Sequence, residues 1–427
     1  MSLNDRSSVA SARLATVALA LALLFAACAT PPTPAPLPER PPAPTTDLAF
    51  DNGVDYAVDD LLIQVQRLPA FNPPPKSSGG IAGLGKKEDA PPPRGVIAVD
   101  PVIDGTTGQQ TASSRSLDNR LLQRASAKFT QFDVVPVSAA SLGQAQYLLV
   151  GTLSLIAVAN SASGSFRINL SLTDIKTGFV VAQSAARVRG DAVDTTPTAF
   201  YRDSPSLTKD RIVEGQIRTA EAPTGAQADE IYLSRLSITA LINEGAKLYE
   251  SGDYAQALRH YESAAERPEG QQLRVLNGIY LANIQLGRAD GAERAFARIV
   301  ALGLATNSLS VKFLFRPGSL EFLVDAKANT PYDMWLRTIA RGIASSTACL
   351  TIVGHTSKTG TEQLNDRLST QRAVAIQRRI EALAPETAVR LKSVGMGFRE
   401  NLVGSGTDDL RDALDRRVSF TIRDCRA

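Results

Sequence analysis

The sequence predicts a multidomain α+β protein, because its apolar residues follow three different patterns in three regions. Residues 47–205 alternate helical and strand-like segments, which indicates an α/β domain. Residues 238–304 keep a helical period that repeats after about 35 residues, which is typical of helical hairpins. Residues 308–427 return to strands between helices and favour a mixed-sheet domain. A length of 427 residues also favours several domains.

The chain begins with the features of a bacterial lipoprotein signal peptide at residues 1–27. Two arginines precede an apolar run of about 14 residues, Leu14–Ala27, and Cys28 follows directly. The run is shorter than the roughly 20 residues of a membrane helix, and an ordinary secretory signal with a chance cysteine is the alternative. We predict that Cys28 is lipidated. Ala29 in the next position resembles the sorting signal for the outer membrane, which implies an anchor on its periplasmic face.

A Pro-rich tract follows this cysteine. Residues 28–46 include PPTPAPLPERPPAPTT, a composition that favours extended polyproline II and cannot build a core. At about 3.1 Å per residue the tract would reach roughly 55 Å. We therefore expect a tether.

Residues 47–205 carry the signals of the α/β domain. A helix is expected over Val54–Leu68, and strands are expected over Val96–Val99 and Tyr147–Val150 with a helical segment between them. Alternating apolar residues then predict a hairpin over 166–188 with one buried face.

This order of elements resembles the periplasmic domain of the CsgG, FlgO and LpoB-like lipoproteins. The resemblance rests on GVIAVDPVID at 95–104, QYLLVGTLS at 146–154 and LSLTDIKTGFVVAQS at 170–184. It implies binding to partners in the cell envelope rather than catalysis.

Two segments are predicted to be irregular. Residues 72–94 are rich in Pro, Gly and Lys and are expected to form a mobile loop, and residues 206–237 are expected to be a linker. The loop contains Gly80–Lys87, which is close to a phosphate-binding motif. That motif requires Ser or Thr where Lys87 stands, with a strand before it and a helix after it. Nucleotide binding is therefore not predicted.

Residues 238–304 are predicted to form two helical hairpins. The small and aromatic residues that recur are Gly245, Gly252, Tyr254, Ala257, Tyr261 and Ala264, followed by Tyr280, Gly287, Ala289, Ala292, Phe296 and Ile299. This pattern resembles the tetratricopeptide repeat. Two copies are fewer than the three usually needed for stability, so neighbouring elements must cover the open faces. The hairpins would be either a spacer or a concave surface for other envelope proteins.

Residues 308–427 predict a third domain of alternating strands and helices. The expected elements are a strand over Val311–Phe315, a helix over Tyr332–Ile343, a strand over Leu350–Val353, a helix over Leu364–Leu383 and a last strand over Val418–Ile422.

These elements resemble the C-terminal domain of the OmpA family, a peptidoglycan-binding fold. The family pattern is a strand ending in G-Y-T-D, then Gly, N-x-x-L-S-x-x-R-A, a G-x-G segment and R-R-V in the final strand. The matching residues are Gly354, Thr356, Gly360, Asn365, Leu368, Ser369, Arg372, Ala373, Gly395, Gly397, Arg416, Arg417 and Val418.

The resemblance implies that the domain binds the diaminopimelate of the peptidoglycan stem, which carries a free carboxylate and an ammonium group. A fixed arginine would give paired donors to the carboxylate, and an aspartate would hold the ammonium. Arg372 matches the arginine, whereas Ser357 replaces the aspartate and Arg316 replaces a second acidic residue. Either Glu362 or Asp366 substitutes for them, or the pocket no longer recognises diaminopimelate. The candidate peptidoglycan-binding residues are Arg372, Asn365, Thr356, Ser357 and Arg416.

The chain has three cysteines, and lipidation of Cys28 would leave Cys349 and Cys425 as a pair. Cys349 opens one predicted strand and Cys425 follows the last one. If those strands are antiparallel, the two ends lie side by side, as a disulfide requires. The alternative is two separate thiols.

Composition and motifs argue against several other functions. A net charge of +3 without a basic block predicts no nucleic-acid binding. The two histidines, His260 and His355, are too few for most multi-histidine metal sites, and His355 is expected to fill a packing position. No Cys/His nucleophile pair or HExxH motif is present. We therefore predict no enzyme activity, no cofactor and no metal.

The sequence thus predicts a non-enzymatic, lipid-anchored outer-membrane protein that tethers the membrane to peptidoglycan and also binds envelope proteins. The main alternative is an assembly or regulatory adaptor of an envelope or secretion machine whose last domain no longer binds diaminopimelate. A pore-forming subunit is a third, minor alternative that rests on the CsgG resemblance alone.

Overall fold

The computed structural model describes residues 38–68, 71, 94–156, 164–323, 331–403, 406, 408, 411–423 and 425. The signal peptide, Cys28 and the first part of the tether lie outside the described residues, as does the expected loop up to residue 93. Within the described part of the chain, no helix is both long and apolar enough to cross a bilayer.

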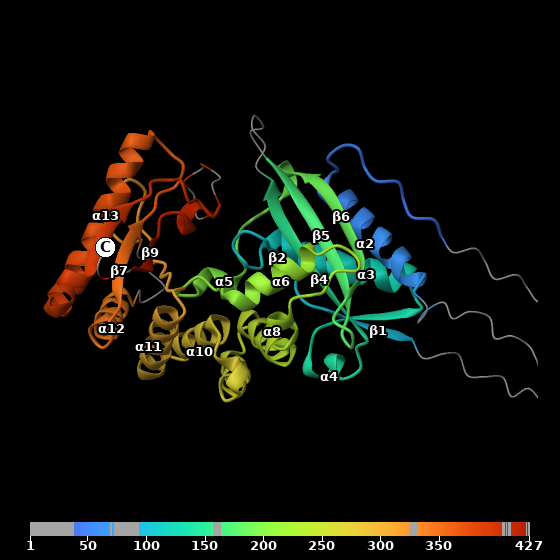
Figure 1. The fold of residues 1–427 in the computed structure, drawn as a ribbon, viewed down its shortest axis with the longest axis horizontal. Helices are drawn as coiled ribbons and strands as arrows, with labels where there is room; N and C mark the ends of the chain where they lie inside the picture. The colour runs from blue at the N-terminus through green and yellow to red at the C-terminus, as the bar shows by residue number, and fades with distance from the viewer. Residues whose placement is uncertain are drawn as a thin grey trace, which may run out of the picture. The chain divides into compact units, whose positions relative to one another are not determined.

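The first domain is built on one mixed sheet with the strand order β3-β1-β4-β5-β6, and the short β2 pairs with β4 (Figure 1). Strands β1 and β4 are parallel, as are β1 and β3, whereas β4, β5 and β6 are antiparallel. The elements are α2 (Phe50–Gln66), β1 (Gly95–Val99), β2 (Ile103–Asp104), α3 (Ala112–Lys128), β3 (Phe132–Pro136), α4 (Ala139–Leu142), β4 (Tyr147–Ile156), β5 (Ser165–Asp174) and β6 (Val180–Arg189).

Helices α2 and α3 cover one face of this sheet because their apolar stripes meet the inward-facing strand residues. Val54 and Leu121 belong to the same core as Ile97 and Leu149. The helix expected over 54–68 and the strands and hairpin expected after it are present at nearly the predicted positions.

The segment expected to be a linker, residues 206–237, is instead largely helical. It contains α6 (Arg211–Glu221) and α7 (Glu230–Leu233), which follow α5 (Ala199–Asp203). Val213 and Ala220 of α6 are buried, and Ser171 of β5 donates a hydrogen bond to the Thr219 carbonyl (2.7 Å). This segment therefore covers the second face of the first sheet, and the prediction of a linker does not describe it.

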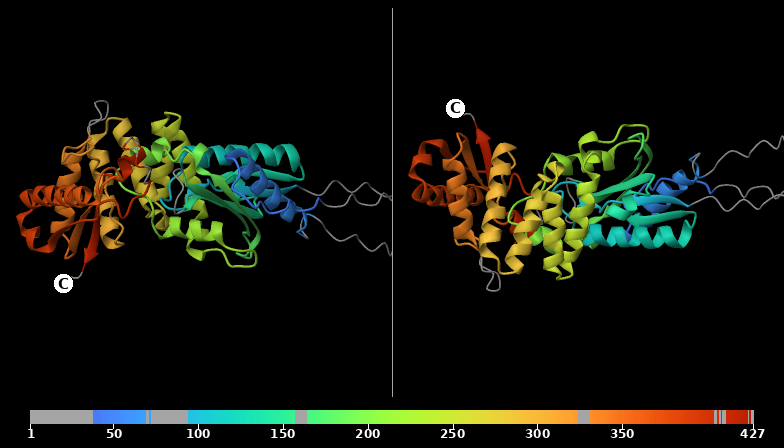
Figure 2. Two further views of the ribbon diagram at one scale, coloured as in Figure 1. Left: turned by 90° about the horizontal axis from the view of Figure 1, so that it is seen from above. Right: turned by 90° about the horizontal axis from the view of Figure 1, so that it is seen from below.

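Two helical hairpins follow: α8 (Leu236–Glu250) with α9 (Tyr254–Ala265), and α10 (Leu273–Gln285) with α11 (Ala289–Ala305). Consecutive helices pack against each other, as the further views show (Figure 2). Gly252 and Gly287 end the first helix of each hairpin with φ of 84° and 69°, a conformation that favours glycine. A Cβ on Gly278 would lie 2.4 Å from the Tyr261 ring, which explains the small residue at this crossing. The kinship with tetratricopeptide repeats stays a prediction.

The last domain contains α12 (Tyr332–Ala344), β7 (Cys349–Gly354), α13 (Glu362–Leu383), β8 (Leu391–Gly395) and β9 (Val418–Arg423). Strand β7 lies between β8, to which it is parallel, and β9, to which it is antiparallel. Single-turn 3-10 helices occur at Gly190–Ala192, Pro268–Gly270 and Arg411–Leu414, and a longer one spans Pro385–Arg390.

The strand predicted over Val311–Phe315 is wrong. The side chains of Val311, Phe313 and Phe315 are buried as the alternation suggested, but the backbone forms only isolated bridges, from Val311 to Ser206 and from Phe315 to Phe322. The reason is that this segment divides its backbone bonds between two neighbours. Lys312 N–H donates to the Pro205 carbonyl (2.9 Å), and the Leu314 carbonyl accepts from the Leu323 N–H (2.7 Å), so these groups bond to the residues after α5 and to the following turn rather than to a strand.

The predicted bridge between Cys349 and Cys425 is confirmed. The two Cα atoms are 5.1 Å apart and the sulfurs are bonded. Antiparallel pairing sets Cys349 of β7 opposite Arg423 of β9, so Cys425 lies just beyond the end of the ladder. The disulfide thus closes the last strand onto the central strand of the sheet.

Candidate functional site

The loop that links β7 to α13 carries Thr356 and Ser357, and the helix after it carries Asn365 and Arg372. Gly354 ends β7, and a Cβ there would lie 1.9 Å from the Ser369 carbonyl oxygen, so glycine lets α13 lie directly on the strand. Asn365 Nδ2 donates to the carbonyls of Thr359 (2.8 Å) and Thr361 (3.0 Å). Asn365 therefore fixes the shape of the loop.

Arg372, in the middle of α13, is fully buried. Its Nη2 donates to the Arg316 (3.0 Å) and Ser319 (3.1 Å) carbonyls, its Nε donates to the Ser319 carbonyl (3.2 Å), and its Nη1 donates to the His355 carbonyl (3.2 Å). These four bonds use four of the five guanidinium N–H groups. Burial, and next the neighbouring Arg416, lower the pKa of Arg372 to about 10, so it is a cation at neutral pH. In this conformation Arg372 holds the turn at residues 316–319 rather than offering paired donors to a ligand.

Asp408 supplies a negative charge next to Ser357. The Ser357 hydroxyl donates to Asp408 Oδ1 (2.7 Å), and Arg416 Nη1 donates to the same oxygen (2.7 Å). Arg416 also donates from Nε to the Phe315 carbonyl (3.2 Å). The structure thus brings the predicted residues Ser357 and Arg416 together, and it adds a carboxylate that sequence reasoning missed.

The two acidic residues proposed as substitutes both form ion pairs with another residue, Arg399. Glu362 pairs with Arg399 (3.1 Å), and Asp366 pairs with the same guanidinium (2.7 Å). Arg316, at the second acidic position of the family pattern, is exposed and faces Glu321 across 3.6 Å. Among the described residues, the side chain of Ser357 is hydrogen-bonded to Thr359 and Asp408 instead.

Thr356 and His355 complete the buried part of the loop. Thr356 is 1% exposed, and its Oγ1 has no hydrogen-bond partner among the described residues. His355 Nε2 lies 2.9 Å from Ser419 Oγ. Burial, and next the Arg417 guanidinium, lower the pKa of His355 to about 3, which keeps its ring neutral. No group of three or more metal-ligating side chains occurs in the described ranges.

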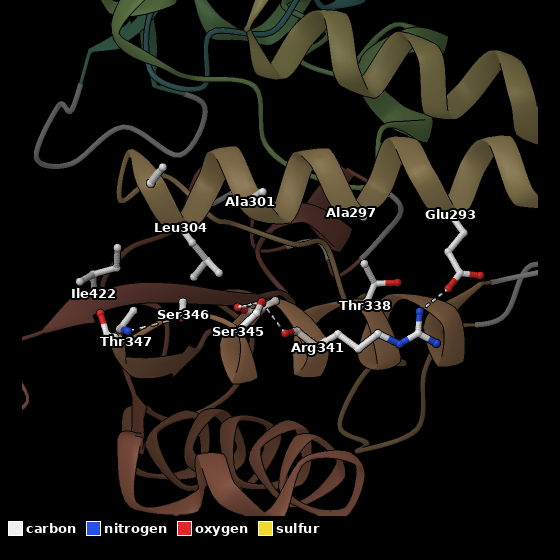
Figure 3. A pocket seen from close by; sticks show the side chains of 13 residues that line it. Glu293, Ala297, Ala301, Leu304, Thr338, Arg341, Ser345, Ser346, Thr347 and Ile422 are labelled. Carbon is white, nitrogen blue, oxygen red and sulfur yellow. Dashed lines mark hydrogen bonds and ion pairs between the residues drawn. The ribbon is translucent and has the colours of Figure 1, made fainter.

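A separate groove of about 710 Å³ lies between α11 and α12 (Figure 3). Ala297 and Ala301 line it from α11, Thr338 lines it from α12, and the ion pair of Arg341 with Glu293 (2.9 Å) crosses one part of it. It contains none of the predicted site residues.

Comparison with known proteins found similarity to solved structures and to one family model. The crystal structure of the peptidoglycan-associated lipoprotein from Burkholderia pseudomallei is similar over 27% of this chain and 90% of that chain, with 22% identity and a TM-score of 0.23. No curated protein matches this chain. The model of the OmpA family matches residues 314–413. These residues, which hold the site of Arg372, Ser357 and Asp408, form a domain of the OmpA family.

Proposed function

We propose that this protein is a non-enzymatic lipoprotein that is anchored in the outer membrane at Cys28 and binds peptidoglycan through its OmpA-family domain. The observation that carries the proposal is the cluster of Asp408, Ser357 and Arg416 beside the buried Arg372. Opposite charges held close together suit a ligand that bears a carboxylate and an ammonium group, as the diaminopimelate of the peptidoglycan stem does. The signal-like sequence before Cys28 supports the membrane end of the tether.

Co-sedimentation with purified sacculi tests the proposed binding of peptidoglycan. The substitution Cys28→Ser prevents attachment of the lipid. The full chain with this substitution should sediment with diaminopimelate-containing sacculi. Arg416→Ala removes a donor to Asp408 and should weaken sedimentation, whereas Arg399→Ala at the outer ion pairs should not. A folded Cys28→Ser chain that stays in the supernatant would falsify peptidoglycan binding.

Labelling with radioactive palmitate tests the proposed lipid anchor at Cys28. The wild-type chain should incorporate label and fractionate with outer membranes, and Cys28→Ser should abolish both. Label that persists in Cys28→Ser would contradict the anchor.

A second candidate function, an adaptor for envelope proteins, is favoured by a groove on the helical hairpins. This groove has a volume of about 420 Å³, and it is lined by Glu262 of α9, by Glu266 directly after that helix, and by Arg294 and Arg298 from α11. Charges of both signs along one groove suit a partner segment with complementary charges. Cross-linking in cells should yield a specific adduct that Arg294→Glu with Arg298→Glu removes. An unchanged set of adducts would leave the hairpins as a spacer.

A further inference from the structure

We propose that Arg40 and Asp60 form a clasp that fastens the second half of the Pro-rich tether to the first domain and so shortens the reach of the tether. Residues 40–46, which we call the strap, belong to the tract that the sequence predicts as a free tether. The clasp is formed by described residues, whereas its effect on the distance from the membrane rests on the proposed lipid anchor at Cys28.

The clasp is a two-point contact between a guanidinium and a carboxylate. Arg40 Nε donates to Asp60 Oδ1 (2.7 Å), and Arg40 Nη2 donates to Asp60 Oδ2 (3.0 Å). Such paired bonds fix the relative position of both groups. Gln64 Nε2 also donates to Asp60 Oδ2 (3.1 Å) and to the Gln183 carbonyl of β6 (2.8 Å). The first domain therefore presents the Asp60 carboxylate to the tether in a fixed position.

The two sides of the clasp differ in burial. The side chain of Asp60 is 3% exposed, whereas that of Arg40 is 50% exposed. A buried carboxylate is unfavourable unless a cation and hydrogen bonds compensate its charge. Within the described part of the chain, Arg40 is the only cation that pairs with Asp60. Docking of the tether thus stabilises the domain, because the tether brings the charge that Asp60 requires.

The other acidic residues of α2 have a different role. Three of them, Asp51, Asp55 and Asp59, pair with basic residues of α3. Asp60 makes no ion pair with α3 among the described residues, although it directly follows Asp59. The charges that join α2 to α3 are therefore separate from the clasp, and removal of Arg40 leaves them in place.

The strap leads to a second attachment on β6. Leu48 N–H donates to the Arg187 carbonyl (2.9 Å), and the Leu48 carbonyl accepts from the Arg189 N–H (2.9 Å). Because Asp60 lies ten residues beyond the first residue of α2, the strap runs back along this helix (Figure 1). Residues 41–46 make no hydrogen bond within the described structure, so the clasp holds the N-terminal end of the strap.

Proline lowers the entropy that docking of the strap costs. Pro41, Pro42 and Pro44 have a fixed φ and few conformations to lose. With the strap fastened, the eleven residues 29–39 remain between Cys28 and the clasp. At about 3.1 Å per residue they reach roughly 34 Å, and release of the seven strap residues would add about 22 Å. The clasp therefore determines which of two lengths the tether has.

Spin-label distances test whether Arg40 holds the tether. Labels are placed on Glu39→Cys and Ala127→Cys, two exposed positions, in the full chain with Cys28→Ser, and the native disulfide takes no label. The parent pair should give one narrow distance distribution, and Arg40→Ala should give a broad one. Arg40→Lys should give an intermediate width, because lysine keeps the charge but loses the paired donors. Arg94→Ala, which removes an exposed ion pair of the same domain, is the matched control and should stay narrow.

A second variant separates release of the strap from loss of the fold. Arg40→Ala leaves Asp60 without its cation, so Arg40→Ala with Asp60→Asn is measured beside it and should give the same broad distribution. Circular dichroism and an intact disulfide establish folding. A narrow distribution in either folded variant would overturn the clasp.

Labels on Cys28 itself and on Ala127→Cys measure the reach in the unlipidated full chain. The longest populated distance should increase by about 22 Å in Arg40→Ala, and it should stay unchanged in Arg94→Ala. Equal distances in the parent chain and Arg40→Ala would overturn the role of the clasp in setting the reach. Neither measurement needs the lipid, so a failure of palmitate labelling would remove the proposed anchor and leave the clasp standing.

Discussion

The indole N–H of Trp335 donates to the hydroxyl of Tyr280 across 2.9 Å, and this bond joins the last domain to the helical hairpins. The Trp335 ring also stacks on Phe296 of α11, with ring centroids 5.3 Å apart. Helix α12 therefore covers the open face of the second hairpin. On the other side Phe200 of α5 stacks on Tyr261 of the first hairpin. Both ends of the two-hairpin array are thus closed by neighbouring domains, as a short array requires.

Tyr280→Phe should destabilise the protein by about 1–3 kcal/mol, because it leaves the buried Trp335 N–H without its acceptor. Urea unfolding monitored by Trp335 fluorescence measures this change, since Trp335 is the single tryptophan in the chain. Tyr254→Phe, at a half-buried tyrosine whose hydroxyl has no hydrogen bond within the described residues, is the control and should stay within about 0.5 kcal/mol. Equal effects of the two variants would contradict a specific link.

Gly354→Ala should disrupt the last domain. The added Cβ would lie 1.9 Å from the Ser369 backbone oxygen, and a helix backbone cannot yield as a flexible side chain can. We expect a loss of about 3 kcal/mol or more in unfolding free energy. Gly143→Ala is the control, because its Cβ would meet no atom closer than 3.6 Å. Hydrogen exchange of β7 amides should rise in the first variant alone, and protected β7 amides in Gly354→Ala would refute the steric argument.

Lys312 should make stability depend on pH. Its side chain is buried and donates from Nζ to the carbonyls of Tyr201 (2.8 Å) and Arg202 (3.1 Å). Burial lowers the pKa of Lys312 from 10.5 to about 7. Between pH 7 and pH 10.5 the unfolded chain therefore binds more protons than the folded chain, so this group makes stability rise with pH across that window. Below pH 7 both states are protonated and the burial cost is fully present.

Lys312→Met should flatten the pH dependence of unfolding between pH 7 and pH 10. Urea midpoints at half-unit pH steps provide the measurement. Lys176→Met, at an exposed lysine, should preserve the slope of the parent chain. The assignment fails if the slope persists in Lys312→Met.

Reduction of the bond between Cys349 and Cys425 should lower stability by about 4 kcal/mol in the chain-entropy model for a loop of 76 residues. Denaturant unfolding with and without dithiothreitol measures the loss. Cys349→Ala with Cys425→Ala should reproduce it and become insensitive to the reductant. Sensitivity that survives in the double variant would point to another cause.

Periodic apolar patterns predicted the elements that bury one continuous face. Helix α13 and strands β7 and β9 lie where the sequence placed them, because each packs its stripe against a single layer. The stretch around Phe313 was misjudged, since alternation reports burial of side chains and is silent on backbone pairing. Helix α6 was missed because its buried face includes Gly215, Gln216 and Thr219, which carry little apolar signal.

Prediction of the candidate site from the sequence has the same limit. Thr356, Ser357 and Asn365 follow a local motif, and the loop and the first turns of α13 that hold them could be anticipated from it. Asp408 comes from a distant segment, and the only signal was the acidic pair Asp408–Asp409 before the last strand. Which carboxylate reaches Ser357 is decided by the turn that brings Asp408 beside Arg416, and one-dimensional spacing does not encode that turn.

The bond between Cys349 and Cys425 also determines how the domain would respond to mechanical tension. Under the proposed function, a pull between membrane and wall loads the OmpA-family domain through its bound ligand. Without a cross-link, the 76 residues between the cysteines could extend by about 250 Å once the fold yields. The covalent bridge keeps the two ends of that segment together, so the segment cannot be drawn out end to end. The OmpA-family domain would therefore behave as a short, inextensible link even when its strands separate.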